Sequence, residues 1–187
     1  MTKINLRRLA RLPSLALCYS LMFMAPCLAD DSESSRKTLR GLPGVLVAVN
    51  DLDQSTVRKN CPLDAAQLKT DAELRLRKGG ISVLSAEQLA KSPGGPVLSI
   101  NISCTGNEEQ SFSVVLVMVS QEVVLARDPS VHLYVTTWSA SGGTGMIGIE
   151  AIEKSTRDKL ADQVDKFLNA YLAANPSPPM TPRIKPR

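Results

Sequence analysis

Three glycines near the end of the chain have the spacing of a nucleotide-binding loop. Residues 143–148 read Gly-Thr-Gly-Met-Ile-Gly, which matches the pattern G-x-G-x-x-G. In a dinucleotide-binding fold, such glycines let the backbone approach a pyrophosphate at the start of a helix. That fold also needs a second strand after the helix, ending in an acidic residue about 20 residues further on. Here the predicted helix leads only into a proline-rich tail. We therefore interpret the glycines as a turn or bulge.

The polar residues around these glycines leave a second use open. Hydroxyl side chains alternate with glycines between residues 139 and 148, and hydroxyl and backbone N–H groups can hold an anion or a small ligand. The neighbouring tryptophan offers an aromatic surface to a partner, although burial beneath a helix is the competing interpretation. The candidate contact residues for a ligand or partner are Trp138, Ser139, Ser141, Gly143, Thr144 and Gly145.

The other reactive side chains do not form a catalytic set. His132 is the single histidine, and strict alternation along its strand places it on the same face as Trp138, with no nucleophile and acid positioned beside it. Asp51 and Asp53 form an acid pair in a loop, where a turn or helix cap also accounts for them. We predict no catalytic residue, no metal ligand and no cofactor, and expect that the protein is not an enzyme. A hydrolase using His132 or Asp51 remains a third hypothesis.

Two cysteines downstream of the N-terminal segment can form a disulfide bond. Cys61 precedes a predicted helix, and Cys104 lies on the apolar face of a predicted strand. A helix packed on that face would bring the two sulfur atoms together. In an oxidising compartment, closing this loop would stabilise the fold by about 4 kcal/mol on the chain-entropy model. Two buried thiols are the main alternative, because a metal site would lack further ligands.

The first 29 residues have the features of a secretory signal peptide. A basic start precedes an apolar stretch at residues 15–25, which is too short to span a bilayer. Ala29 then supplies a small residue before the acidic segment that begins with Asp30. We predict cleavage between Ala29 and Asp30, export to the periplasm or the medium, and no transmembrane segment after processing.

Two other export routes compete with general secretion. Cys27 sits where a lipid-modified cysteine would lie, but Pro26 directly before it departs from that motif. The pair Arg7 and Arg8 is similar to a twin-arginine signal, but Ala10 stands where that motif carries a large apolar residue. General secretion fits these residues best.

The charges of the chain argue against nucleic-acid binding. The formal net charge is +4, but four basic residues lie within the first 11 positions and no acidic residue precedes position 30. From residue 30 onward the chain carries 18 charges of each sign, and residues 42–175 carry 12 basic against 15 acidic residues. A mildly acidic domain repels a phosphate backbone. We expect no nucleic-acid partner.

The apolar pattern predicts the elements that position these residues. The predicted helices show apolar residues every three or four positions, and the predicted strands are β-branched or alternating. Their order indicates an α/β (α+β) fold, a two-layer sandwich in which two long helices cover one face of a mixed sheet of about five strands. The strands are expected at residues 42–49, 81–84, 97–104, 112–127 and 131–138, the long helices at 63–78 and 149–174, and a glycine-rich connection at 139–148.

The domain organisation follows from the same pattern. After the signal peptide at residues 1–29, the polar residues 30–41 are expected to form a flexible leader. Residues 42–175 form a single α/β domain, and residues 176–187 form a disordered, proline-rich basic tail.

Three stretches of the chain resemble segments of small secreted bacterial proteins of unassigned function. These are residues 70–77, 81–85 and 170–176. The predicted architecture is also similar, at the level of the fold, to the N-terminal α/β domain of TolB-type envelope proteins. Neither resemblance carries a catalytic signature or transfers a function.

Two functions are consistent with these observations. The leading hypothesis is a non-enzymatic, exported interaction module that binds another envelope protein through its sheet edge or through residues 138–148. The alternative is a small-ligand or anion-binding protein that uses the glycine-rich connection at residues 139–148.

Overall fold

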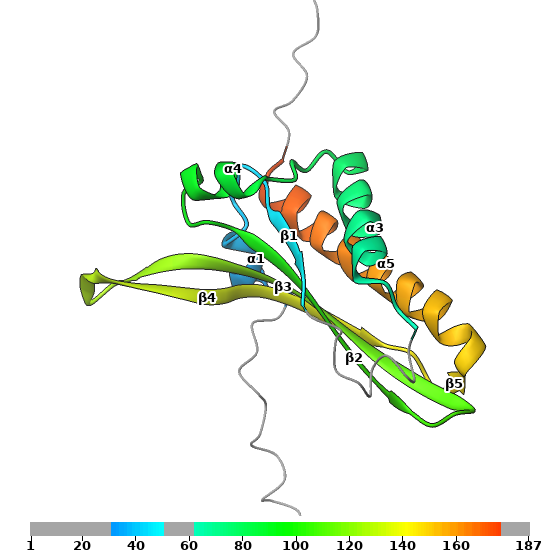
Figure 1. Cartoon of the computed structure of the whole chain (residues 1–187). Helices are drawn as coiled ribbons and strands as arrows, with labels where there is room; N and C mark the ends of the chain where they lie inside the picture. Colours follow the sequence, from blue (N-terminus) through cyan, green and yellow to red (C-terminus); the bar gives the residue numbers. More distant parts are fainter. Residues whose placement is uncertain (1–30, 51–61, 177–187) are drawn as a thin grey trace, which may run out of the picture.

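Two long helices lie across one face of a twisted sheet (Figure 1). The computed structural model describes residues 31–50 and 62–176. The helices are α1 (Glu33–Lys37), α3 (Ala65–Lys78), α4 (Ala86–Lys91) and α5 (Ile149–Ala174). The strands are β1 (Leu46–Val49), β2 (Val97–Gly106), β3 (Gln110–Leu125), β4 (Asp128–Gly143) and β5 (Ile147–Gly148).

The sheet is mixed and contains five strands, which confirms the predicted fold class. Its order is β1-β2-β3-β4, and β5 pairs with the beginning of β3. β1 runs parallel to β2, whereas the other neighbours are antiparallel. The predicted strand at residues 81–84 is a single bridge between Val83 and Val45. β5 takes its place as the fifth strand.

The alternation of β2 places its apolar side chains beneath the helices, as predicted. Leu98, Ile100, Ile102 and Cys104 are buried, while the residues between them are more exposed. In β3 the same face carries buried valines at positions 115, 117 and 119. These two strands form the floor of the core.

The two long helices begin and end where the sequence predicts. The Asp64 side chain caps α3 by accepting hydrogen bonds from the backbone of Ala66 and Gln67, and Gly79 is its C-cap. α5 buries an apolar stripe that includes Phe167, whose ring meets that of Trp138 edge-on at 5.4 Å between centroids. Burial of these faces against the sheet supplies the core.

The N-terminal leader is part of the fold, so the prediction of a flexible segment is wrong for residues 31–41. Ser32 caps the short helix α1, and Leu39 is fully buried in the core. The Asp31 carboxylate accepts a hydrogen bond from Trp138 Nε1 at 2.8 Å. The polar composition of this segment did not predict its place in the fold, because it is anchored by individual contacts with distant residues and not by a periodic apolar face.

The predicted connection at residues 139–148 is also largely wrong. β4 continues through Gly143, with Ser139 opposite Met118 and Gly143 opposite Val114, and β5 follows after three residues. The glycines allow close packing here, because a Cβ at Gly142 would collide with the buried side chain of Gln163. Because Gly142 has no side chain, β4 can continue beneath α5 as far as Gly143.

A β-bulge divides β4 into two parts that face opposite ways. Trp138 lies opposite Val119, but the next pair is Thr136 opposite Ser120, so Thr137 is the extra residue. Trp138 consequently points to the helices, whereas His132 lies on the other face. The expectation that strict alternation puts these two side chains on one face is wrong for this reason.

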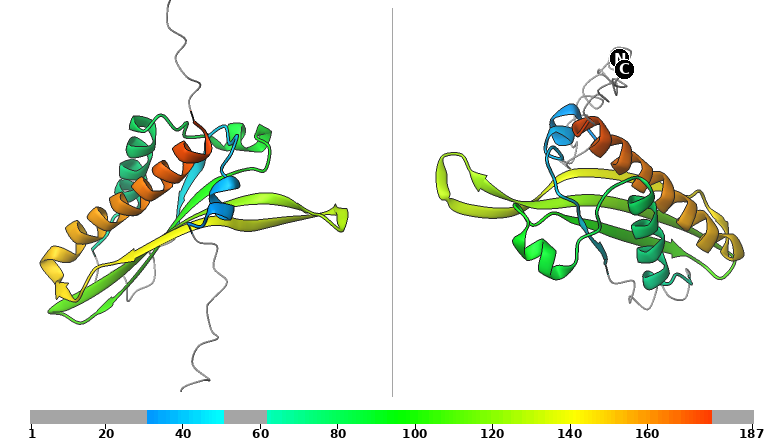
Figure 2. Two further views of the ribbon diagram at one scale, coloured as in Figure 1. Left: turned by 180° about the vertical axis from the view of Figure 1, so that it is seen from behind. Right: turned by 90° about the horizontal axis from the view of Figure 1, so that it is seen from above.

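Beyond the bulge, the β3–β4 hairpin leaves the body of the molecule. Figure 2 shows it projecting past the helices as a two-stranded ribbon. We call residues 120–136 the arm. The loop after α4 braces its base, because the Glu122 N–H donates to the Gly94 carbonyl at 2.8 Å and the Tyr134 hydroxyl donates to the Gly95 carbonyl at 2.8 Å.

Candidate functional site

The glycine motif forms a closed turn between β4 and β5. Gly143, Gly145 and Gly148 all lie outside the positive-φ region. Thr144 ties the turn to β3, because its N–H donates to the Ser113 carbonyl at 2.9 Å and its hydroxyl accepts from the Ser113 N–H at 2.8 Å. These groups are therefore engaged within the chain, and the geometry adds no support for a phosphate-binding loop.

The candidate contact residues at the end of β4 do not converge on one surface. The side chain of Trp138 is fully buried between the sheet and α5. Ser139 and Ser141 lie opposite Met118 and Leu116, on the face of the sheet away from the helices. Neighbouring residues of a strand point to opposite faces, so one ligand cannot contact both Trp138 and the serines.

The structure places one of the two cysteines of the predicted disulfide. Cys104 is only 7% exposed and packs with Ile152 in a small apolar cluster. Leu63 packs against the same cluster. Cys61 lies outside the described residues. The disulfide stays a prediction.

The other candidate residues are separate from one another. Ala29, Asp30, Asp51 and Asp53 lie outside the described residues. His132 is exposed on the arm, with Nδ1 at 2.6 Å from the Glu122 carboxylate. Among residues 31–50 and 62–176, no three potential ligands gather as a metal site would need, and no helix has the length and apolar character to cross a membrane.

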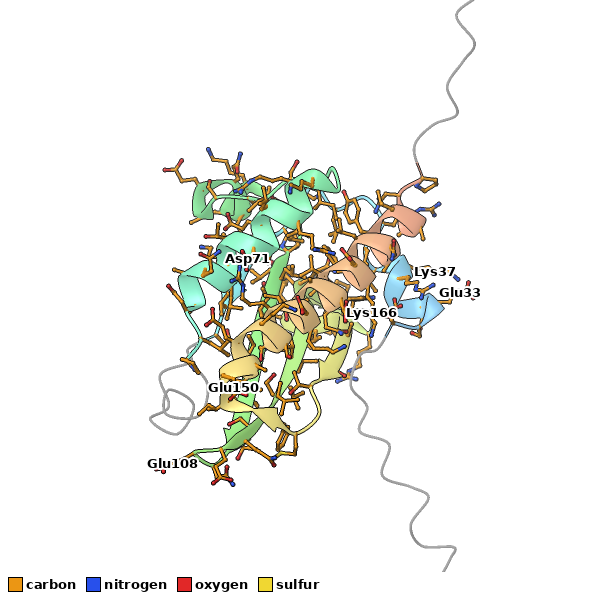
Figure 3. All side chains as sticks on the ribbon, turned by 90° about the vertical axis from the view of Figure 1, so that its right-hand side faces the viewer. Glu33, Lys37, Asp71, Glu108, Glu150 and Lys166 are labelled. Carbon is orange, nitrogen blue, oxygen red and sulfur yellow. The ribbon has the colours of Figure 1, made fainter. Side chains whose placement is uncertain are left out.

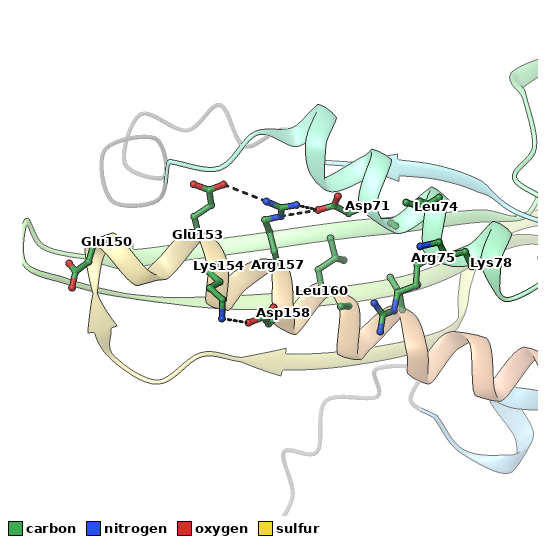
Figure 4. A pocket seen from close by; sticks show the side chains of 13 residues that line it. Asp71, Leu74, Arg75, Lys78, Glu150, Glu153, Lys154, Arg157, Asp158 and Leu160 are labelled. Atoms are coloured by element: carbon green, nitrogen blue, oxygen red, sulfur yellow. Dashed lines mark hydrogen bonds and ion pairs between the residues drawn. The ribbon is translucent and has the colours of Figure 1, made fainter.

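A groove of about 510 Å³ separates α3 from α5 (Figure 4). Arg157 pairs with Asp71 across it at 2.8 Å, and Arg75 forms a two-pronged pair with Asp165. The hydrogen bond to Arg75 lowers the pKa of Asp165, with burial opposing it. Both arginines are already paired with carboxylates, so these ion pairs connect α3 to α5. The paired guanidinium groups would attract an anionic ligand only weakly.

Charged side chains lie on the outer surface of the helical layer. Figure 3 labels Glu33 and Lys37, which pair at 2.8 Å on α1, and Glu150 and Lys166 on α5. Such exposed pairs contribute little to stability. The exposed surface of the helices is therefore largely charged, and Leu74 on α3 and Leu172 on α5 are its exposed large apolar residues.

Exposed apolar side chains gather on the arm. Val124, Leu133, Tyr134 and Val135 are 51%, 44%, 56% and 37% exposed. Leu133 and Val135 point to the helical side of the ribbon, because Val135 lies opposite Gln121, whose amide reaches Thr38. Val124 and Tyr134 lie on the opposite face, so apolar side chains remain in water on both faces of the ribbon, as is typical of a contact surface.

The free edge of β4 adds directional hydrogen-bonding groups to this patch. The Glu122 N–H points away from β4 to Gly94, so Glu122 and Tyr134 form a non-hydrogen-bonded pair. The N–H and C=O of Tyr134 therefore point outward, and the two-residue period gives His132 and Thr136 the same orientation. Within the described parts of the chain, these backbone groups have no partner.

Sequence reasoning missed the arm as a site because it treated the hairpin as part of the core. The apolar residues on both faces of residues 123–135 were the available signal. Apolar side chains on both faces also occur in a central strand. The bulge at Thr137 decides whether this hairpin is a central part of the sheet or an exposed arm, and the pattern of apolar residues does not reveal the bulge.

No protein-family model matches this chain, and no curated protein sequence matches it significantly. The resemblance to TolB-type envelope domains therefore stays a prediction. The arm and the free edge of β4 are the basis for a proposal about function.

Proposed function

We propose that this chain is an exported, non-enzymatic domain that binds another protein by adding a strand of that partner to the edge of β4 along the arm. The observation that carries the proposal is the row of outward backbone groups at His132, Tyr134 and Thr136. A peptide in extended conformation pairs with such an edge through main-chain hydrogen bonds, and neighbouring side chains give specificity.

The composition of β4 supports this use of its edge. Monomeric proteins protect a long edge strand with lysine, proline or inward-pointing charges. Residues 131–143 contain no lysine, arginine, acidic residue or proline, and their titratable side chains are His132 and Tyr134. α1 lies beside the middle of β4, where the Thr38 hydroxyl reaches the Thr137 carbonyl at 3.5 Å. The arm beyond it is the accessible part of the edge.

Export is the second part of the proposal. Cleavage between Ala29 and Asp30 would remove no described residue, and Asp31 is already engaged with Trp138 and Arg36. The mature chain would keep every contact described above. Determining the N-terminal residue of the protein recovered from the periplasm or the medium tests this point, and a mature protein that retains residues 1–29 would contradict it.

The placement of His132 supports a binding role over hydrolysis. The hydrolase hypothesis names His132 and Asp51; Asp51 lies outside the described residues, and His132 lies on the exposed ribbon with Glu122 as its neighbour. A general base needs a positioned nucleophile and a site that excludes water. The exposed pair fits a cross-strand contact that stabilises the arm.

Site-specific photo-crosslinking in the native envelope tests the binding surface. A photoreactive amino acid at Thr136 would lie on the free edge, and one at Lys154, an exposed residue of α5, serves as the matched control. We expect a discrete adduct from Thr136 and none from Lys154. Equal yields at both positions, or no adduct at Thr136, would overturn the proposed surface.

A further inference from the structure

We infer that the strand received by β4 is β4 of a second copy, with the two arms antiparallel around a two-fold axis at Tyr134. This inference rests on the proposed function and names its partner. The outward residues His132, Tyr134 and Thr136 are spaced symmetrically about Tyr134. A two-fold axis at that position sets Tyr134 opposite its own copy and His132 opposite Thr136 of the second copy.

This register uses every outward backbone group of the segment. Residues that face each other in a hydrogen-bonded antiparallel pair exchange both N–H···O=C bonds. The N–H and C=O groups of His132, Tyr134 and Thr136 would all be satisfied, with none left over at either end. A contact that pairs the same patch on both copies is isologous, which is the usual form of a two-fold dimer.

The side chains of the same segment are also self-complementary. Leu133 falls opposite Val135 of the second copy in a non-hydrogen-bonded pair, where opposing Cα atoms are about 4.5 Å apart. These two side chains are 44% and 37% exposed in one copy, so pairing would remove apolar surface from water twice. The tyrosines at the axis would lie on the other face.

Electrostatic repulsion does not oppose a second copy as the occupant. Like charges directly opposite each other destabilise a strand pair. Between Val131 and Gly143 the strand has no permanent charge, so the symmetric register brings no like charges together. The area buried by this contact would be smaller than that of a standard interface, which is about 1,600 Å². We expect dissociation in the micromolar range.

Charge variants at the paired positions test the register. In the mature protein, the double variant His132→Lys/Thr136→Lys would oppose two ammonium groups at each end of the contact, whereas His132→Lys/Thr136→Glu would oppose an ammonium and a carboxylate. Sedimentation analysis at roughly 1–200 µM should show a dimer that the first variant weakens about tenfold or more and the second restores. Circular dichroism checks that each variant is folded.

Cysteine crosslinking tests the axis directly. Tyr134→Cys would place two thiols on residues whose Cα atoms are about 5.5 Å apart, a distance that a disulfide bridges. Ser130→Cys is the matched control, since in this register the two copies of that residue lie roughly 26 Å apart along the edge. We expect rapid formation of covalent dimer with Tyr134→Cys and little with Ser130→Cys.

The outcomes separate this inference from the proposed function. A mature protein that stays monomeric over the whole concentration range, or crosslinks equally at both positions, overturns pairing with a second copy. A photo-adduct at Thr136 with a different protein would then still support strand addition. The absence of any adduct and of any dimer would overturn both.

Discussion

Trp138 connects the N-terminus, the sheet and the long helix through one side chain. Its ring packs against Phe167, and its Nε1 donates to the Asp31 carboxylate. Asp31 in turn holds Arg36 in a two-pronged pair. The sequence alone suggested an exposed patch or burial for this tryptophan, and the side chain is buried because the bulge turns it toward the helices.

Replacing Trp138 by phenylalanine should be costly. The change leaves a cavity under α5 and removes the donor to Asp31, so we expect a loss of about 2–3 kcal/mol in the free energy of unfolding. Tyr134→Phe is the matched control, because that ring is exposed and its hydroxyl contacts only backbone groups, at Gly95 and Val97, which should limit the loss to about 1 kcal/mol or less. Urea denaturation measures both. Equal losses would contradict the central role of Trp138.

Two glycines that look alike in the sequence should respond differently to alanine. A Cβ on Gly44 would collide with the backbone carbonyl of Ser82, which also accepts a hydrogen bond from Val45, and the φ of this glycine is +153°. A Cβ on Gly145 would meet no atom within 4 Å. We expect Gly44→Ala to destabilise the fold by more than about 2 kcal/mol and Gly145→Ala by less than about 0.5 kcal/mol.

The Gly145→Ala variant also bears on ligand binding. A loop that cradles a phosphate with its backbone would not tolerate the added methyl group. Thermal unfolding measures the stability of Gly44→Ala and Gly145→Ala. A large loss of stability in Gly145→Ala would contradict the open space around Gly145 in this structure.

At the scale of the element, the bulge at Thr137 controls which way the arm faces. Deleting Thr137 would reverse the faces of the arm or of the core strand, because side chains alternate with a period of two. We expect a loss of more than about 3 kcal/mol in the free energy of unfolding. Thr137→Val keeps the backbone and removes only the hydroxyl that accepts from Gln121 at 2.7 Å, so its cost should be about 1 kcal/mol.

The predicted disulfide between Cys61 and Cys104 can be tested on the mature protein. Leu63, next to the start of α3, packs against the cluster that contains Cys104, the described member of the predicted bond. We expect thiol titration of the unfolded, unreduced mature protein to find no free thiol, and reduction to lower stability by roughly 4 kcal/mol on the chain-entropy model. Two titratable thiols in the unreduced protein would refute the bond.

The elements that the sequence predicted well are those governed by local signals. The alternation of β2, the capping of α3 by Asp64 and its end at Gly79 all depend on neighbouring residues. The misplaced features depend on contacts distant in the sequence. The strand at residues 139–143 exists because it pairs with residues 114–118, and α1 is held in place through Asp31 and Leu39.

The site was harder to predict than the fold for the same reason. Residues 143–148 match the pattern of a nucleotide-binding loop, but in the structure they form a turn. The free edge at Tyr134 has no sequence signature, because its outward orientation follows from a hydrogen bond between Glu122 and Gly94. Only the order of the strands shows which edge is unpaired.

At the scale of the whole molecule, acid should weaken the fold. The hydrogen bond to Arg36 lowers the pKa of Asp31, with burial opposing it and Trp138 adding to it, and Arg75 lowers the pKa of Asp165. A carboxyl with a lowered folded-state pKa stabilises the fold fully above its unfolded-state pKa of about 3.9 and loses that contribution as pH falls through the folded value.

The expected pH profile therefore declines below about pH 4. Asp31→Asn and Arg36→Gln should each reduce the steepness of that decline, because each removes one member of the same pair. Urea denaturation at a series of pH values measures the effect. A profile with the same steepness in all three proteins would show that this pair does not contribute to acid sensitivity.

The segment from Asp31 to Leu42 is fastened to parts of the chain that are synthesised much later. Asn175 at the end of α5 holds the Leu39 carbonyl at 2.9 Å and the Gly41 N–H at 2.6 Å, and the Tyr171 hydroxyl holds the Leu42 carbonyl at 2.9 Å. Contacts of such long sequence separation close slowly and only once both ends exist. A growing chain therefore cannot fix residues 31–42 in place before α5 has been synthesised, and a chain that stays open until then would be compatible with the export proposed above.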